Sequence, residues 1–97
     1  MNPEERIKVI HERARLAIMS ALAAQAQLTF GELRELLDLT DGNLSVHAAV
    51  LEEHGLIRVK KEFVERKPRT TFSLTEKGRK EFAKYVEELE RMLRGGE

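Results

Sequence analysis

The chain has 97 residues, no cysteine and a formal net charge of zero, with 17 basic and 17 acidic side chains. This length suits one domain with a single hydrophobic core. The lack of cysteine excludes disulfides and thiolate metal sites, and zero net charge argues neither for nor against nucleic-acid binding. The longest apolar run, residues 16–24, is too short to span a bilayer and follows no signal-peptide pattern, so we expect a soluble, cytoplasmic protein.

Charge is distributed unevenly along the chain. Residues 30–55 carry one basic and six acidic side chains, whereas residues 56–69 carry six basic and two acidic ones. The segments 1–29 and 70–97 are close to neutral. The zero net charge therefore hides an acidic centre that is followed by a basic segment.

Residues 3–25 are predicted to form one long helix. Pro3 suits a first helical turn, and neither glycine nor proline interrupts the residues that follow. Apolar side chains recur at helical spacing, and the second half is apolar on most sides, which indicates a helix covered from two directions. The main apolar stripe consists of Ile7, Ile10, Ala14, Ala17, Ile18 and Ala21.

Two short helices are predicted next, at residues 29–38 and 40–54. Thr29 and Glu32 have the spacing of a capping box, and Thr40 is a second candidate N-cap. Gly55 suits the end of the second helix. Two short helices joined by a turn of two or three residues have the layout of a helix-turn-helix.

Residues 56–74 change to alternating periodicity, which predicts a two-stranded hairpin. In "LIRVKKEF" one side holds Ile57, Val59 and Phe63 and the other holds charged residues. In "TTFSL" one side holds Thr70, Phe72 and Leu74. The segment between them, residues 64–69, is polar and contains Pro68, so we expect a charged loop there.

The last predicted helix covers residues 75–94, from the cap residue Thr75 to the "GG" pair. Its apolar positions have the spacing of a face that docks on another helix, and they are Phe82, Val86, Leu89 and Leu93. The order α-α-α-β-β-α, with long terminal helices, predicts a mainly α winged helix-turn-helix that forms one domain over residues 1–97. Residues 40–54 are its recognition helix and residues 56–74 its wing hairpin.

A helical wheel divides the predicted recognition helix into a core side and an outward side. Leu44, Ala48 and Leu51 form the core side, and Asn43 and Ser45 lie on the flanks. The outward side is small and mostly apolar, and consists of Gly42, Val46, Ala49, Val50 and Glu53. Small side chains let a helix lie deep in a major groove, and asparagine is able to pair with adenine.

The hairpin supplies the positive charge that this helix lacks. Five cations cluster within ten residues around its predicted tip: Lys60, Lys61, Arg66, Lys67 and Arg69. Such an arm suits a phosphate backbone or a minor groove, although lysines also protect exposed edge strands. We therefore predict double-stranded DNA binding. The alternative is a protein-interaction module, because Asp41, Glu52 and Glu53 repel phosphates.

No catalytic or metal site is predicted. His47 and His54 lie on one predicted helix without a third ligand at a usual spacing, and Ser45 and His47 point apart because they are two residues apart. The sequence has no phosphate-binding glycine loop. We expect neither a cofactor nor an enzyme.

The motifs "DGNLSVH", "EEHGLI" and "PRTTFSLTEKGR" resemble those of a small winged-helix family of prokaryotic transcriptional regulators related to the MarR and ArsR types. The resemblance covers roughly residues 10–90. It implies a homodimer with terminal helices in its interface, DNA contacts from the third helix and the wing, and an unidentified small-molecule effector. Metal sensing of the ArsR type usually needs cysteines, which this chain lacks. Val46 is a departure, because a basic residue is common there in the broader class.

These arguments define two sets of candidate residues. The candidate DNA contacts are Thr40, Asp41, Gly42, Asn43, Ser45, Val46, Ala49, Lys60, Lys61, Arg66, Lys67 and Arg69. The candidate dimer-interface residues, placed on the terminal helices by the resemblance, are Ile7, Ile10, Ala14, Phe82, Val86, Leu89 and Leu93.

Overall fold

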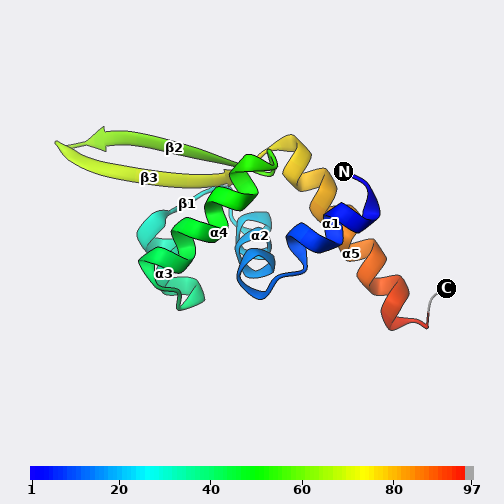
Figure 1. Ribbon diagram of the computed structural model, residues 1–97. Helices are drawn as coiled ribbons and strands as arrows, with labels where there is room; N and C mark the ends of the chain where they lie inside the picture. The colour runs from blue at the N-terminus through cyan, green and yellow to red at the C-terminus, as the bar shows by residue number, and fades with distance from the viewer. Residues whose placement is uncertain (96–97) are drawn as a thin grey trace.

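The computed structural model describes residues 1–95, which form five helices and a three-stranded antiparallel sheet (Figure 1). The elements in chain order are α1 (Pro3–Ile10), α2 (Arg13–Ala24), β1 (Leu28–Thr29), α3 (Phe30–Leu37), α4 (Asp41–Glu53), β2 (Ile57–Val64), β3 (Lys67–Leu74) and α5 (Glu76–Leu93). Four helices, a long hairpin and a final helix confirm the predicted winged helix-turn-helix fold, with α1 and α2 in place of the single first helix that was expected.

The predicted helix at residues 3–25 is wrong in one respect, because it is broken into α1 and α2. Glu12 is extended and caps α2, with its carboxylate accepting a hydrogen bond from the N–H of Arg15 at 2.8 Å. The Arg15 side chain in turn donates to the carbonyl of Val9, near the end of α1, at 2.6 Å. Local capping thus stabilises a break that helix propensity alone does not indicate.

The caps of the later helices are those that the sequence predicts. Thr29 and Glu32 form a complete capping box, and Thr40 and Thr75 each accept a backbone N–H in the first turn of their helices. Gly55 follows α4 with a φ of 72°, a left-handed conformation that glycine adopts without steric cost.

The sheet has the strand order β1-β3-β2, and β1 was not expected. Only two residues of β1 pair with β3, with Leu28 opposite Phe72. The hairpin spans nearly the predicted residues, but its strands are longer than predicted, because β2 and β3 are joined by Glu65 and Arg66 alone, both with positive φ. This is the backbone sign pattern of a two-residue type I′ turn.

The expectation of a loop over residues 64–69 is therefore wrong, since Pro68 belongs to β3 and pairs with Phe63. Val64 and Lys67 close the two-residue turn as a hydrogen-bonded pair, so the next pair outward is a non-hydrogen-bonded one. The ring nitrogen of Pro68 then points away from β2, to the side where β1 does not extend. Proline is tolerated at such an edge position because no ladder hydrogen bond is lost.

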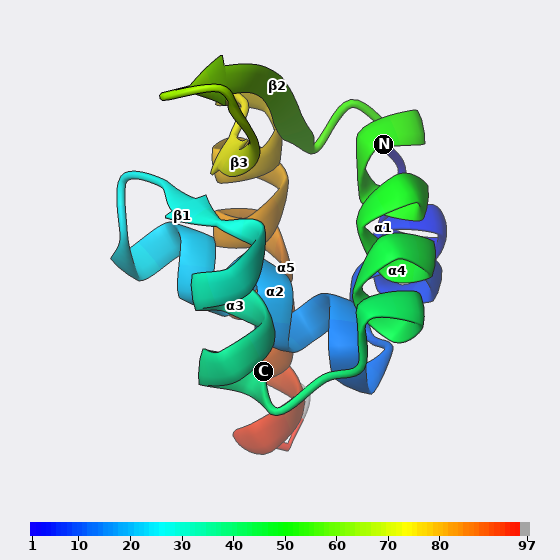
Figure 2. The same cartoon turned by 90° about the vertical axis from the view of Figure 1, so that its left-hand side faces the viewer.

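The core is centred on α2, which contacts α1, α3, α4, α5 and β3. Its fully buried side chains are Ile10, Ile18, Met19, Leu22, Leu33, Leu44, Leu51 and Leu56. The molecule is elongated, measuring 53 × 25 × 21 Å, with the hairpin projecting at one end and the C-terminal part of α5 at the other (Figure 1). Viewed towards the hairpin end, α3 and α4 lie below the hairpin on either side (Figure 2).

Candidate nucleic-acid interface

Helix α4 presents a small, uncharged strip of side chains to solvent. Leu44, Ala48 and Leu51 are buried, as the helical wheel predicts, which turns Val46 and Ala49 outward. Val46 is 62% exposed and has no core role. The other exposed candidates on this helix and its cap are Thr40, Asp41, Gly42, Asn43 and Ser45.

Val50 is the exception among the residues predicted to point outward. It is half-buried and packs against the core cluster. At 100° per residue it lies closer to the buried arc than Val46 does, so the neighbouring elements cover it. The outward strip of α4 is therefore narrower than expected.

The N-terminal end of α4 carries a cation that the sequence reasoning missed. Nη1 of Arg34, on α3, donates to the carboxylate of Asp41 at 2.7 Å. Arg34 is the only basic residue among residues 30–55, and the turn between the helices brings it to the first residue of α4. The local charge of Asp41 is thereby balanced, and this end of the helix repels phosphate less than its sequence suggests.

The hairpin divides its cations between its two faces. Side chains alternate along a strand, so Lys61 lies on the face of Val59, whereas Lys60 lies on the opposite face, 3.5 Å from the Glu62 carboxylate. Lys67 and Arg69, on β3, share the face of Lys60 by the same alternation, and Arg66 lies in the turn. All five candidate cations are exposed.

A groove of about 550 Å³ separates α4 from the hairpin. Ser45 and Ala49 line it from α4, and Lys61 and Thr70 line it from the strands. The remaining lining residues are Phe30, Ala48, Glu52, Val59 and Phe72. The groove therefore has a cation and two hydroxyl groups above an apolar floor, but also one carboxylate.

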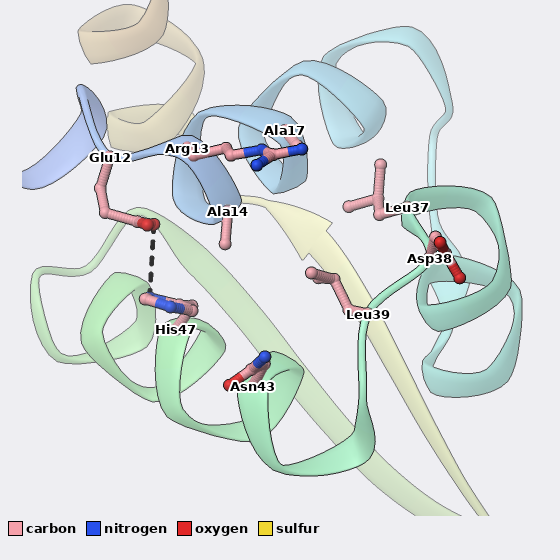
Figure 3. A pocket seen from close by; sticks show the side chains of 9 residues that line it. All are labelled: Glu12, Arg13, Ala14, Ala17, Leu37, Asp38, Leu39, Asn43 and His47. Carbon is pink, nitrogen blue, oxygen red and sulfur yellow. Dashed lines mark ion pairs between the residues drawn. The ribbon is translucent and has the colours of Figure 1, made fainter.

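A second cavity, of about 420 Å³, lies on the other flank of α4, beside the start of α2 (Figure 3). Asn43 and His47 extend into it from α4, Glu12 at the cap of α2 points toward His47, and Arg13 lines the cavity beside Ala17. Asn43 thus lies on the α2 flank of the helix and Ser45 on the hairpin flank. Arg13 is an exposed cation that no sequence motif linked to α4.

Glu12 and His47 connect α2 to α4, with 3.5 Å between the Glu12 carboxylate and Nδ1 of His47. Arg15 also lies 3.0 Å from this imidazole nitrogen. Burial raises the pKa of Glu12, but the N–H of Arg15 and the charges of His47 and Arg15 more than offset it and lower that pKa below its usual value. The contact orients α4 against the body of the protein.

The candidate dimer residues divide into core and surface positions. Ile10 is fully buried within the protomer, which corrects its assignment to the interface. Ala14, Phe82, Val86 and Leu89 are half-buried, the last three against the core. The exposed apolar side chains at this end are Ile7, Met92 and Leu93, at 38%, 64% and 79%.

Among residues 1–95, no group of three or more histidine, aspartate or glutamate side chains is arranged to hold a metal ion. No helix in this part of the chain is both long and apolar enough to cross a membrane.

The exposed helix of a helix-turn-helix beside a basic hairpin defines a winged-helix nucleic-acid-binding domain. The family model described as a winged helix DNA-binding domain matches residues 14–93, so the chain belongs to this family. This membership places it among DNA-binding regulators rather than enzymes.

The chain is similar to one uncharacterized protein and to solved structures of transcriptional regulators. An uncharacterized protein of Methanocaldococcus jannaschii is 35% identical over 86% of this chain and 90% of its own. A transcriptional regulator homologue from Pyrococcus horikoshii is 33% identical, with a TM-score of 0.87 over 95% of this chain and 93% of its own. A regulator assigned to the MarR family, from Enterococcus faecalis, shares the fold at 23% identity, with a TM-score of 0.78 over 93% of this chain and 84% of its own.

Proposed function

We propose that this chain is a dimeric transcriptional regulator that binds double-stranded DNA with sequence preference. The observation that carries the proposal is the groove between α4 and the hairpin, where a small-residue helix face adjoins a basic strand. A duplex places its major groove against α4 and one phosphate backbone over this groove. Ser45, Val46 and Ala49 then approach base edges, and the valine and alanine suit thymine methyl groups.

The cations act on the phosphates in this arrangement. Lys61 faces the groove, and Arg66, Lys67 and Arg69 surround the tip of the hairpin. Arg34 lies on the first helix of the motif, the one that crosses the backbone in proteins of this class. Phosphate contacts of this kind supply affinity, and the few base contacts of α4 supply preference.

The shape of the molecule supports a dimer. The hairpin projects at one end of the 53 Å long axis, and the exposed apolar ends of α1 and α5 lie at the other (Figure 1). Pairing through Ile7 and Leu93 leaves both hairpins free to contact DNA. A two-fold dimer reads two half-sites about 34–36 Å apart, one helical turn along a duplex.

The test is the salt dependence of DNA binding, measured by fluorescence anisotropy with the duplex upstream of the chain's own gene and a scrambled duplex. Three hairpin cations in each of two subunits give a slope of log affinity against log salt of about −5. Arg66→Ala is expected to reduce this slope by about 2 in a dimer. Lys80→Ala removes the same charge from the exposed side of α5 and serves as the matched control.

A slope near zero for the wild-type chain overturns the proposal. Equal affinity for both duplexes retains DNA binding but removes the sequence preference.

The second candidate is a protein-interaction module, favoured by the 62% exposure of Val46 and by the nearby Glu52 and Glu53. This candidate predicts no binding to any duplex at moderate salt and loss of a protein partner on Val46→Glu. The salt series separates the two functions because apolar protein contacts release no condensed counterions.

A cytoplasmic location and a small-molecule effector belong to the same proposal. An apolar cavity of about 160 Å³ between α1 and α5, lined in part by Ile7, Tyr85 and Met92, lies at the end that we assign to the dimer. An effector that fills it is expected to change the anisotropy-derived affinity for DNA.

A further inference from the structure

Phe63 is an exposed aromatic side chain without a role in the protomer. It lies on β2, opposite Pro68, with 78% of its surface exposed. Phe30, Phe72 and Phe82 each have an aromatic neighbour near 6 Å. A phenyl ring in water forgoes the favourable burial that stabilises the other three, so its surface is available to a partner.

The ring lies on the same side of the hairpin as the groove beside α4. Successive side chains alternate, so Phe63 shares its face with Val59 and Lys61, both of which line that groove. Any long ligand that lies along α4 and passes under the hairpin therefore meets Phe63.

The distance along β2 from Val59 to Phe63 is comparable with the groove widths of a DNA duplex. Phe63 is four residues beyond Val59, or about 14 Å further along an antiparallel strand. The major groove that would hold α4 is about 12 Å wide, and the adjacent minor groove about 6 Å wide. A position about 14 Å from the helix contact lies past one backbone and within the minor groove.

The charges around Phe63 identify the class of partner. Lys61 is two residues away on the same face, Arg66 lies in the turn, and Lys67 follows it. The nearby acids are Glu65 at the tip and Glu62, which lies on the opposite face, 3.5 Å from Lys60. An apolar ring among cations suits a polyanion with apolar surfaces between its charges. A DNA duplex has such surfaces in its sugars and base steps.

We propose that Phe63 enters the minor groove next to the α4 half-site, packs on deoxyribose and wedges into a base step. This inference rests on the proposed DNA binding and adds a residue that contributes affinity without charge. A phenyl ring makes no hydrogen bond to base edges, so its preference is for steps that unstack easily, chiefly pyrimidine–purine steps.

The experiment compares the wild-type chain, Phe63→Ala and Val64→Ala on the duplex that the wild-type chain selects from a randomised pool. Val64 is an adjacent apolar residue on the opposite face of β2 and is the matched control. Phe63→Ala is expected to weaken binding about tenfold while leaving the salt slope unchanged, because no phosphate contact is lost. Val64→Ala is expected to bind as the wild type does.

A second measurement reports directly whether Phe63 inserts into a base step. The base analogue 2-aminopurine, placed at the step under the hairpin, is expected to brighten when the wild-type chain binds and to stay quenched with Phe63→Ala. Both variants must retain the wild-type melting temperature, as the exposure of Phe63 predicts. Phe63→Leu is expected to restore part of the affinity but less of the brightening.

The outcomes separate this inference from the proposed function. If no duplex is selected, both fail. If the wild-type chain selects a duplex but Phe63→Ala matches it in affinity and 2-aminopurine signal, DNA binding stands and the wedge is overturned. The wedge is also overturned if Phe63→Ala loses binding to phosphatidylglycerol vesicles while its DNA binding is intact, since the ring then serves a lipid surface.

Discussion

At Gly78 the first turn of α5 lies directly against the backbone of Leu56. A Cβ atom at this position would overlap the Leu56 carbonyl oxygen. That oxygen is itself held by the N–H of Thr75 at 3.1 Å. Neither backbone is free to move. Only glycine at position 78 therefore lets the first turn of α5 pack this closely against Leu56, the residue that precedes β2.

Gly78→Ala is expected to lower the free energy of unfolding by about 1–3 kcal/mol or more, because the added methyl forces two backbones apart. Urea denaturation measures the change. Gly31→Ala is the control, because Gly31 is helical and a Cβ there meets nothing within 4 Å. It is expected to gain about 0.5–1 kcal/mol. An unchanged midpoint for Gly78→Ala would contradict the close approach.

Val46 occupies the centre of the exposed strip of α4 and is the residue where a basic side chain would add a DNA contact. Val46→Arg is expected to raise DNA affinity and to steepen the salt slope by up to about 2 in a dimer. Anisotropy over a salt series measures both. Stability should change by less than about 0.5 kcal/mol, since the site is exposed. Weaker binding by Val46→Arg would show that this strip does not face DNA.

At the scale of elements, a buried cluster of ion pairs connects α1 to α5. Nε of Arg6 lies 3.2 Å from the Glu81 carboxylate, and these side chains are only 5% and 6% exposed. Glu88 is the second carboxylate partner of Arg6. Glu81 also lies 3.6 Å from Nζ of Lys84 and 3.7 Å from the N-terminal amine. Such a cluster specifies how the two helices dock, because loss of either Arg6 or Glu81 removes the nearest counter-charge of a buried group.

Arg6→Met is expected to cost about 3–5 kcal/mol, because it removes the nearest counter-charge of the buried Glu81 and leaves only the longer contacts to Lys84 and the N-terminal amine. The double variant Arg6→Met with Glu81→Leu should recover much of this loss, and urea denaturation of all four forms gives the coupling energy. The exposed pair Arg34–Asp41 is the comparison, with an expected coupling of about 0–1 kcal/mol. If the two substitutions change the free energy of unfolding additively, Arg6 and Glu81 do not stabilise the docking of α1 on α5 through their interaction.

The same cluster predicts acid sensitivity. Burial raises the pKa of Glu81, but the hydrogen bond and charge of Arg6, together with Lys84, more than offset it and lower that pKa below its usual value. The folded state therefore binds this proton less readily than the unfolded state does. The resulting stability is present above the unfolded pKa of about 4.3 and is lost as pH falls through the folded value.

Free energies of unfolding measured from neutral pH to below this range should fall more steeply for the wild-type chain than for Glu81→Gln. If the free energy of unfolding depends on pH in the same way in both proteins, Glu81 does not contribute to the loss of stability in acid.

At the scale of the whole molecule, the two surfaces that we propose for DNA and for a second copy lie at opposite ends. The hairpin carries exposed cations, and α1 and the C-terminal turns of α5 carry exposed apolar side chains. The hairpin and the C-terminal part of α5 lie at opposite ends of the molecule (Figure 1). Separating the surfaces along the long axis lets one chain contact DNA and a second copy at the same time.

If the proposed dimer forms through Leu93, Leu93→Glu is expected to convert it to a monomer, because the variant places a charge in an apolar contact, and to halve the salt slope of DNA binding. Light scattering measures the mass. Leu36→Glu is the matched control, since Leu36 is a similarly exposed leucine on α3. A dimer that persists in Leu93→Glu would move the interface elsewhere.

Features set by neighbours in the sequence were predictable. The caps at Thr29, Thr40 and Thr75 depend on side chains within three residues, and the buried side of α4 follows from helical spacing. The outward position of Val46 follows from the same spacing. These interactions are local, so the sequence alone determined the winged-helix order and most of the exposed strip of α4, whereas Val50 was covered by neighbouring elements.

Only the tertiary structure decided the features that depend on distant contacts. In the structure the first helix ends before Glu12, Pro68 pairs within β3, and Ile10 is buried within the protomer. It also placed Arg34 against Asp41 and turned Phe63 toward the groove beside α4. Each of these outcomes needs two segments to meet in space, and the periodicity of a single segment carries no information about which surface will face it.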